Sequence, residues 1–479
     1  MKTPTITIAG AGLVGPLLAI SLRQRGFPVV LYERRADMRR VQASDGRSIN
    51  LAVSARGIYA LEQAGVWSEL RDIVIPMGGR LMHLLTGELI FQPYGQDETE
   101  VINSVSRAAL NIALLDAAEA AGVAIHFQQR CLGCARAADG IVGCARAADG
   151  IVGCARAGHG IVVRLRDEQS GKETAIAAEV VIGADGSSSA VRGEMSRSPK
   201  FRLSEERLDY GYKELTIPAG QGGSHRMETH ALHIWPRGSY MLIALPNVDG
   251  TYGCILFLPF EGERGFAALD SESRVVECFR ANFPDALALM PNLAENYFAN
   301  PTGAMVTVRC FPWHQEGNIL LLGDAAHSIV PFFGQGINCG FEDCTCFLEL
   351  LDAARTSGAG SIDWQKLFTD FESSRKPNTE AIADLALENF VEMRDRVADP
   401  HFLFKKKVDL ALEARFPGLY VPKYAMVAFH RIPYVVAQQR GRIQDRLLDE
   451  LCAGMNRLED IDWSKAAMLV HRDLTQLGK

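Results

Sequence analysis

Three glycines near the N-terminus have the spacing of a nucleotide-binding turn. Gly10, Gly12 and Gly15 follow the apolar run Ile6 to Ala9, which is typical of a buried strand. The first glycine permits a tight turn, the second lets a pyrophosphate approach the backbone, and the third lets the next helix pack closely. The N-terminus of that helix presents free N–H groups to phosphate. The spacing predicts dinucleotide binding, and the competing interpretation is a glycine-rich βα turn without a ligand.

An acidic residue follows at the distance that this motif requires. After a helix-like segment, Pro16 to Gln24, the apolar run Val29 to Tyr32 ends on Glu33, 18 residues after Gly15. A carboxylate at this point can accept hydrogen bonds from a ribose diol. Strand, glycines, helix, strand and acid in this order indicate a dinucleotide far more specifically than the glycines alone.

Length and charge exclude several classes of protein. With 479 residues, 48% of them hydrophobic, the chain is long enough for two or three domains with a substantial core. A net charge of −7 argues against a nucleic-acid partner. No stretch is long and apolar enough for a membrane anchor, and 11 cysteines without a secretion signal suggest reduced thiols. We therefore expect a cytoplasmic protein.

The remaining elements follow from periodicity and from turn residues. Arg80 to Pro93 predicts a hairpin that turns at Thr86-Gly87, and Ser106 to Ala121 predicts a helix capped by Ser106. Residues 201 to 300 are dominated by strand-like runs and predict an antiparallel sheet. From Trp364 onward the pattern is helical, and prolines predict breaks at Pro377, Pro400, Pro417, Pro422 and Pro433.

A ten-residue unit is repeated in tandem between Gly133 and Val162. GCARAADGIV occurs twice and GCARAGHGIV once, and each unit has two strand-like halves around an Asp-Gly or His-Gly turn. The repeat therefore predicts a hairpin extension at the surface. It also explains the CxxC formed by Cys131 and Cys134, so these thiols do not indicate a metal site.

Three distant segments together resemble one family. GAGLVG with Glu33, GADGSSSAVR (Gly183 to Arg192) and GDAAHSIVPFFGQGIN (Gly323 to Asn338) are similar to the three flavin-contacting motifs of the class A flavoprotein monooxygenases, which have the hydroxybenzoate hydroxylase-like fold. The resemblance implies tightly bound FAD, NADPH as a transient co-substrate without a Rossmann domain of its own, and O2. Physically, Asp324 can hold a ribityl hydroxyl, and the helix that starts near Asn338 directs N–H groups at the flavin.

The same resemblance implies a set of cofactor-binding residues. They are Gly10, Gly12, Val14, Gly15, Glu33, Arg34, Arg35, Ala52, Arg107, Cys131, Asp185, Asp324, Gly336, Ile337 and Asn338.

Longer stretches resemble one group within that family, the kynurenine 3-monooxygenases of the soluble, bacterial type. Among them are GRSINLAVSARG, IPMGGRLMHLLTGELIFQPYG, YGYKELTIP, ALENFVEMR and VPKYAMVAF. The resemblance implies hydroxylation of L-kynurenine to 3-hydroxykynurenine through a flavin hydroperoxide, with the aniline nitrogen activating the ring. It implies no acid–base residue and no metal.

The substrate residues are carried over from the same group. Arg80 and Tyr94 match its carboxylate clamp, together with Asn389 and Tyr424 from the helical C-terminal part. A guanidinium fork suits a carboxylate, and tyrosine hydroxyls add directional donors. Phe332 and Phe333 either form an apolar wall for the substrate ring or pack in the core.

The expected architecture is α/β. A Rossmann-like FAD-binding domain (residues 1–72, 97–195 and 302–360) is interleaved with an antiparallel β-sheet substrate domain (73–96 and 196–301), and a C-terminal helical region (361–479) follows. Two alternative functions stay open: a hydroxylase of the same fold acting on a hydroxybenzoate or salicylate, and a non-catalytic dinucleotide-binding regulator. The chain is expected to be a monomer or a homodimer.

Overall fold

A largely parallel sheet forms the core of the N-terminal part. The computed structural model describes residues 3–40, 50–95, 97–136, 146–147, 150–151, 160–356, 361–396 and 399–477. The strand order is β20-β21-β14-β1-β2-β8, and only the edge pair β20–β21 is antiparallel. The strands are β1 (Ile6–Ala9), β2 (Val29–Tyr32), β8 (Ala124–His126), β14 (Val180–Gly183), β20 (His314–Gln315) and β21 (Ile319–Leu321). The two strands predicted around the glycine motif are confirmed.

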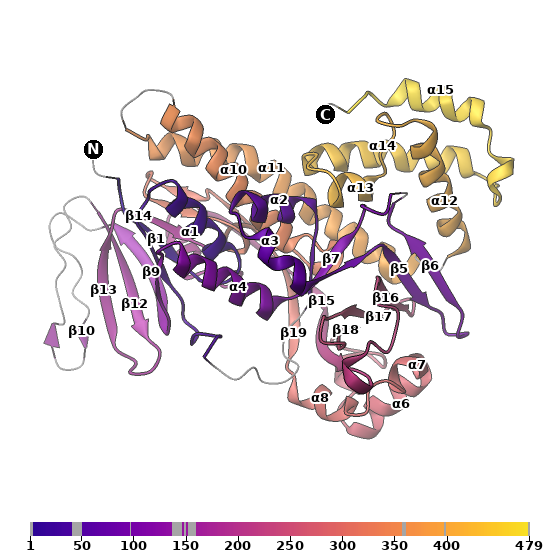
Figure 1. Cartoon of the computed structure of the whole chain (residues 1–479), viewed down its shortest axis with the longest axis horizontal. Coiled ribbons are helices and arrows are strands. Elements are labelled where there is room, and N and C mark those ends of the chain that lie inside the picture. Colours follow the sequence, from indigo (N-terminus) through magenta and orange to yellow (C-terminus); the bar gives the residue numbers. More distant parts are fainter. Residues whose placement is uncertain are drawn as a thin grey trace.

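Helices cover this sheet and join it to two smaller sheets (Figure 1). The helices are α1 (Val14–Gln24), α2 (Ala55–Gln63), α3 (Trp67–Leu70), α4 (Arg107–Ala120), α5 (Ala190–Met195), α9 (Asp324–His327) and α10 (Gly336–Thr356). One small sheet contains β3 (Asn50–Val53), β7 (Ile102–Ser106) and β4 (Val74–Met77), and the other contains β13 (Glu173–Ala178), β12 (Ile161–Asp167) and β9 (Gln129–Arg136). The Ser106 side chain accepts a hydrogen bond from the Ala109 N–H, which confirms the predicted cap.

The tandem repeat is described only in part. Its start lies in β9 and its end in β12. Between them, β10 (Arg146–Ala147) and β11 (Gly150–Ile151) pair antiparallel. Residues 137–145, 148–149 and 152–159, which include Cys144 and Cys154, lie outside the described residues.

A larger sheet lies beside the first, in the order β19-β15-β18-β17-β16-β5-β6. Its strands are β5 (Gly79–His83), β6 (Leu89–Pro93), β15 (Arg202–Ile217), β16 (Ala231–Pro236), β17 (Met241–Pro246), β18 (Tyr252–Pro259) and β19 (Thr302–Phe311). Gly87 has φ +87° and its N–H donates to the Leu84 carbonyl, which confirms the hairpin turn. The sheet is antiparallel as predicted, except that β5 and β16 pair parallel.

Helices that were not predicted from the sequence cover the outer face of this sheet. They are α6 (Glu272–Asn282), α7 (Pro284–Leu287) and α8 (Leu293–Ala299). The strand-like runs end near residue 260, and beyond them Val275 and Phe279 of α6 are fully buried against the sheet. The spacing of these two residues is helical, but the surrounding strand pattern hid it.

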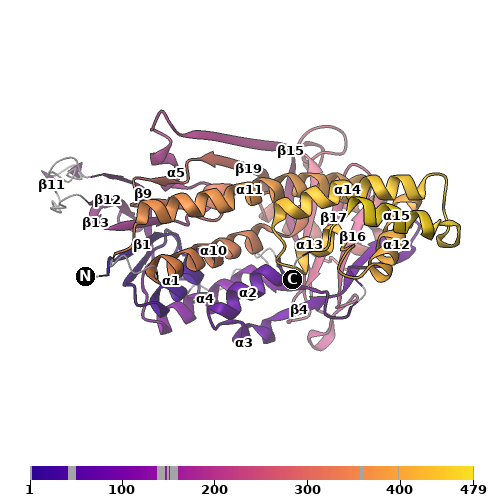
Figure 2. The same ribbon diagram turned by 90° about the horizontal axis from the view of Figure 1, so that it is seen from above.

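Helices continue to the C-terminus, and one predicted break is wrong. They are α11 (Trp364–Val391), a π-helical turn (Glu392–Arg396), α12 (Pro400–Arg415), α13 (Lys423–Ala428), α14 (Tyr434–Cys452) and α15 (Trp463–Asp473). Pro400, Pro417, Pro422 and Pro433 lie at helix starts or between helices, but Pro377 lies inside α11. Burial of α11 between α10 and α14 offsets the loss of the backbone hydrogen bond that this proline cannot donate. Figure 2 shows α11 extending beside α10 and α14.

Within the described ranges, no helix combines the length and apolar character needed to cross a membrane.

Candidate active site

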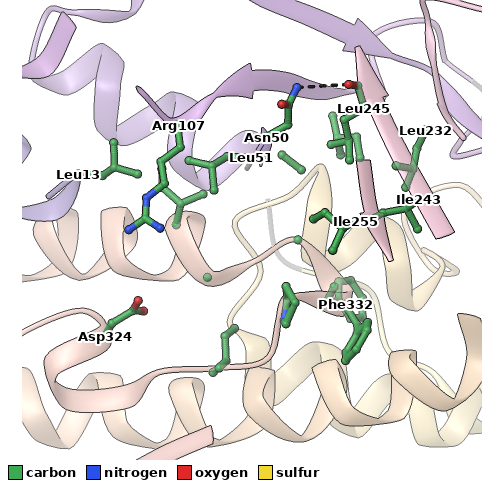
Figure 3. A pocket seen from close by; sticks show the side chains of 18 of the residues that line it. Leu13, Asn50, Leu51, Arg107, Leu232, Ile243, Leu245, Ile255, Asp324 and Phe332 are labelled. Carbon is green, nitrogen blue, oxygen red and sulfur yellow. Dashed lines mark hydrogen bonds between the residues drawn. The ribbon is translucent and has the colours of Figure 1, made fainter. Parts of the chain in front are cut away.

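A cavity of about 290 Å³ lies where the two main sheets and the C-terminal helices meet. The cavity is lined by residues 12–14 at the start of α1, residues 50–52 of β3, and residues 331–334 and 336–337 before and within α10. Side chains of β5, β16, β17, β18 and α13 also line it. In Figure 3, Arg107 and Asp324 face each other at one end, and Leu232, Ile243, Leu245 and Ile255 gather away from them. The cavity therefore has a polar end and an apolar wall beyond it.

Glycines and two helix N-termini form the polar end. A Cβ on Gly12 would meet nothing within 4 Å, whereas a Cβ on Gly15 would lie 2.0 Å from the Gly10 carbonyl oxygen. Gly12 thus leaves open space at the surface of the turn, and Gly15 permits packing. Neither α1 nor α10 has an acidic residue in its first turn, so both N-termini keep their positive dipole ends for an anionic group. These features fit the predicted FAD.

Asp324 is the carboxylate of this end. It starts α9, which is separated from β21 by Leu322 and Gly323, and it lines the cavity opposite Arg107. Burial raises its pKa, and Arg107 and His327 oppose that shift by charge attraction. A buried carboxylate next to an arginine can accept a hydrogen bond from a hydroxyl, which is the role expected of Asp324 toward a ribityl chain.

Seven of the predicted cofactor residues line the cavity: Gly12, Val14, Ala52, Arg107, Asp324, Gly336 and Ile337. The others are not among the residues that line it. Gly10 and Gly15 shape the turn, and Asn338 donates to the carbonyls of Ala52 and Gly334 at 2.8 Å each.

Glu33 and Asp185 make contacts within the protein. Glu33 accepts the Ala11 N–H at 2.8 Å and pairs with Arg35, also at 2.8 Å. Asp185 accepts the Ser189 hydroxyl at 2.5 Å and the Ala190 N–H at 2.7 Å, so it fixes the start of α5. Arg34 is exposed beyond β2. Burial, reinforced by Asp185, raises the pKa of the Cys131 thiol on β9 to about 12. Their roles toward the cofactor stay proposals.

A buried guanidinium among aromatic rings marks the other side of the cavity. Arg80 on β5 is 6% exposed, and its Cζ lies 5.2 Å from the ring centroid of Tyr424 and 5.7 Å from that of Tyr94. Glu392 lies 3.7 Å from Arg80 Nη1, beyond hydrogen-bond distance. Among the described residues, Arg80 Nε and the Tyr94 hydroxyl have no hydrogen-bond partner. Buried donors without partners are costly, so this cluster fits an anionic ligand group.

Both tyrosines remain neutral donors. Burial raises the pKa of Tyr94 and of Tyr424, and the nearby charge of Arg80 opposes both shifts. Their rings stack at 5.1 Å, and Tyr424 also stacks on Phe333 at 5.4 Å. The structure thus brings together segments that are hundreds of residues apart in the sequence.

Asn389 is not among the residues that line this cavity. Its Nδ2 donates to the Phe332 carbonyl at 2.7 Å, and the side chain borders a neighbouring cavity behind Phe333. Phe332 lines the main cavity and stacks on Phe390 at 4.2 Å. Asn389 therefore holds the turn that carries Phe332, and its direct part in a carboxylate clamp stays a prediction.

Sequence reasoning missed the apolar wall between the two ends. Inward-facing residues of the large sheet form it: Leu232, Ile243, Leu245, Ile255 and Phe257, joined by Met393. Alternation along β17 and β18 could have identified this face. No local signal indicates that Leu232 pairs beside Arg80 across the parallel β5–β16 contact.

One described group, His327, Cys339 and Asp343, has metal-ligand types. His327 Nε2 lies 2.6 Å from one Asp343 oxygen, and the Arg375 Nε donates to the other at 2.8 Å. Burial opposes a charge on His327, but attraction to Asp343 outweighs it and raises the pKa to about 10. These contacts make a buried ion network, and the arginine charge disfavours a metal cation.

Comparison with known proteins agrees with this geometry. The model of the FAD binding domain family matches residues 2–386. A kynurenine 3-monooxygenase of Myxococcus xanthus is 49% identical over 479 residues, which is 100% of this chain and 97% of the relative. The same enzyme of Xanthomonas axonopodis pv. citri is 44% identical, covering 99% of this chain and 98% of the relative.

A solved structure shows the same fold. The C294A mutant of 2-methyl-3-hydroxypyridine-5-carboxylic acid oxygenase superposes with a TM-score of 0.62 at 20% identity, covering 84% of this chain and 96% of that one. Fold, cofactor end and full-length identity agree. The chain belongs to the kynurenine 3-monooxygenases, within the family of FAD-dependent monooxygenases.

Proposed function

We propose that this chain hydroxylates L-kynurenine to 3-hydroxykynurenine with FAD, NADPH and O2, and that Arg80, Tyr94 and Tyr424 bind the substrate carboxylate. The observation that carries the proposal is one cavity that joins the cofactor-binding motifs to a buried guanidinium beside two stacked tyrosines. Gly12, Arg107 and Asp324 would hold FAD, which would supply the redox chemistry between NADPH, O2 and the substrate ring.

The residues of the cavity orient the substrate along its length. A carboxylate held by Arg80 and the two tyrosine hydroxyls directs the rest of the molecule along Leu232, Leu245 and Ile255 toward the polar end. The apolar wall excludes water, which keeps reactive oxygen for the ring instead of releasing it as peroxide. The aryl amine of the substrate donates electron density to its own ring, so the protein needs no general base there.

Phe332 is proposed to contact the substrate ring. Phe332 lines the cavity, and its ring centroid lies 5.0 Å from that of Phe257. The Asn389 amide holds Phe332 in place by donating to the Phe332 backbone carbonyl. Removing the Asn389 amide would loosen this turn. We therefore propose that Asn389 acts on the ring position, in addition to any contact with the amino-acid end.

The decisive experiment measures NADPH oxidation by the yellow purified protein, with and without L-kynurenine, and analyses the product. We expect kynurenine to accelerate NADPH oxidation and 3-hydroxykynurenine to accumulate. Acceleration by a hydroxybenzoate or salicylate but not by kynurenine would favour the alternative hydroxylase. Colourless protein, or NADPH oxidation that no aromatic acid stimulates, would favour the non-catalytic regulator.

A further inference from the structure

A fully buried arginine joins the cofactor side of the molecule to the substrate side. Arg56 of α2 is 1% exposed. Its Nη1 pairs with Glu342 of α10. On its other side, Nε donates to the Val427 carbonyl at 3.4 Å and Nη2 donates to the Ile432 carbonyl. Arg56 therefore contacts both α10, which begins at the cavity, and the C-terminal end of α13, which carries Tyr424.

The stability of α13 depends on its contact with Arg56. A helix of six residues, Lys423–Ala428, is too short to be stable alone. The positive charge of Arg56 lies at its C-terminal end, where carbonyl oxygens lack helical partners and a cation is favourable. Glu342 has a second partner, because the Arg375 Nη1 donates to its other oxygen at 2.8 Å. Loss of Arg56 would thus free α13 without leaving the Glu342 carboxylate unpaired.

Tyr434 forms a second link between the same regions. Its hydroxyl donates to Gln335 Oε1 at 2.9 Å, and its ring centroid lies 3.9 Å from Arg56 Cζ. Gln335 directly precedes Gly336, where α10 begins, and its Nε2 donates to the Ser54 hydroxyl at 3.3 Å. Tyr434 therefore ties the start of α14 to the segment that lines the polar end of the cavity.

Residues 54–57 and residues 335–338, which connect the Arg56 and Tyr434 contacts, pack tightly against each other. The Ser54 N–H donates to Asn338 Oδ1 at 2.8 Å, and a Cβ on Gly57 would lie 2.5 Å from that same oxygen. Residues 54–57 and 335–338 must therefore move together, because a close-packed interior transmits displacement instead of absorbing it. A shift of α13 toward a bound carboxylate would therefore displace the start of α10.

We propose that Arg56 and Tyr434 couple the substrate clamp to the cofactor-binding segment, so that kynurenine and FAD strengthen each other's binding. This coupling rests on the proposed function. Neither residue lines the cavity, and both are positioning residues. Because coupling between two binding sites is reciprocal, it can be measured at the FAD site.

The test follows FAD release when the full-length holoenzyme is diluted. Flavin fluorescence gives the FAD dissociation constant with and without saturating L-kynurenine, and the ratio of the two constants measures the coupling. For the native chain we expect kynurenine to lower the dissociation constant at least about fivefold. In Tyr434→Phe and in Arg56→Lys the ratio should fall toward one. Tyr434→Phe removes a single hydroxyl, so it keeps the test available if Arg56→Lys fails to fold.

Arg431→Ala is the matched control. Its Cζ lies 3.5 Å from the ring centroid of Tyr59 on α2, and Nη2 lies 3.5 Å from Glu349 of α10. The Arg431 side chain thus bridges α2 and α10 through Tyr59 and Glu349, and not through the Val427 and Ile432 carbonyls that Arg56 contacts. The native ratio should be retained in this variant.

The outcomes separate the coupling from the function. If the variants weaken FAD binding equally with and without kynurenine, the ratio stays native, the residues are only structural and the coupling is rejected. If kynurenine leaves native FAD release unchanged yet accelerates NADPH oxidation, the coupling is rejected and the proposed function stands. If kynurenine does neither, both are rejected.

Discussion

The two ends of the cavity are built on different principles. At the cofactor end, glycines and the N-termini of α1 and α10 present backbone, and Arg107 reaches in from an exposed position. At the substrate end, the charge of Arg80 is buried among the rings of Tyr94 and Tyr424. A charge in such a poorly solvated setting interacts more strongly with a partner than an exposed one. The cofactor end therefore depends on backbone shape, and the substrate end on buried side chains.

Arg80→Ala should give the largest effect, at the substrate end only. Losing a buried charge-assisted contact weakens kynurenine binding by about 2–4 kcal/mol, which is roughly thirty- to a thousandfold in the dissociation constant. Titration of the flavin absorbance with kynurenine measures this effect, and the FAD content should stay native. Arg107→Ala is the matched control and should weaken FAD retention instead. Unaltered kynurenine affinity in Arg80→Ala would reject the assigned clamp.

Two glycine substitutions should separate shape from packing at the cofactor end. Gly15→Ala introduces a Cβ 2.0 Å from the Gly10 carbonyl oxygen and should destabilise the fold by about 1–3 kcal/mol. Gly12→Ala meets nothing within 4 Å, so its free energy of unfolding should change by less than about 0.5 kcal/mol while FAD content falls. Thermal unfolding of the FAD-free chains and flavin absorbance test both expectations. A native FAD content in Gly12→Ala would show that the pyrophosphate does not approach this turn.

Tyr94→Phe and Tyr424→Phe should have smaller effects. Each variant keeps the stacked ring and removes one hydroxyl donor, so kynurenine binding should weaken by about 0.5–1.5 kcal/mol. The same absorbance titration measures the change. A loss of FAD in place of kynurenine affinity would mean that the two ends are not functionally distinct.

The free energy of unfolding should depend on pH through Glu413, which lies near the substrate end. Glu413 lies on α12, which borders Arg80 through Asp409 and Leu410. Burial, with Glu100 and Asp409 adding repulsion, raises the pKa of Glu413 from 4.5 to about 7. Between these values the unfolded chain has lost the proton that the folded protein keeps, so the free energy of unfolding falls as pH rises.

Glu413→Gln removes the carboxyl group whose ionisation destabilises the folded protein. The variant should match the native chain at pH 4 and exceed its stability at pH 8 by about 1 kcal/mol, because the half-exposed group is screened by solvent. Chemical denaturation at the two pH values tests the prediction. Equal stability at pH 8 would place the Glu413 proton outside this window.

Local sequence determined the cofactor end. The turn at Gly10 to Gly15, the start of α10 and the position of Asp324 each depend on a few consecutive residues, because backbone conformation at glycines and helix starts is a local property. The same reasoning identified the Thr86-Gly87 turn and the cap at Ser106. It failed at Pro377, where packing of α11 overrides the local preference, and at α6 to α8.

Only the tertiary structure decided how the substrate end is assembled. The sequence offered Arg80, Tyr94 and Tyr424 through resemblance, but not their stacking, the turn held by Asn389 or the bridge made by Arg56. These contacts join segments separated by hundreds of residues, and the parallel β5–β16 pair has no local signal. Such contacts are selected by burial of whole surfaces against one another, which no short stretch of sequence encodes.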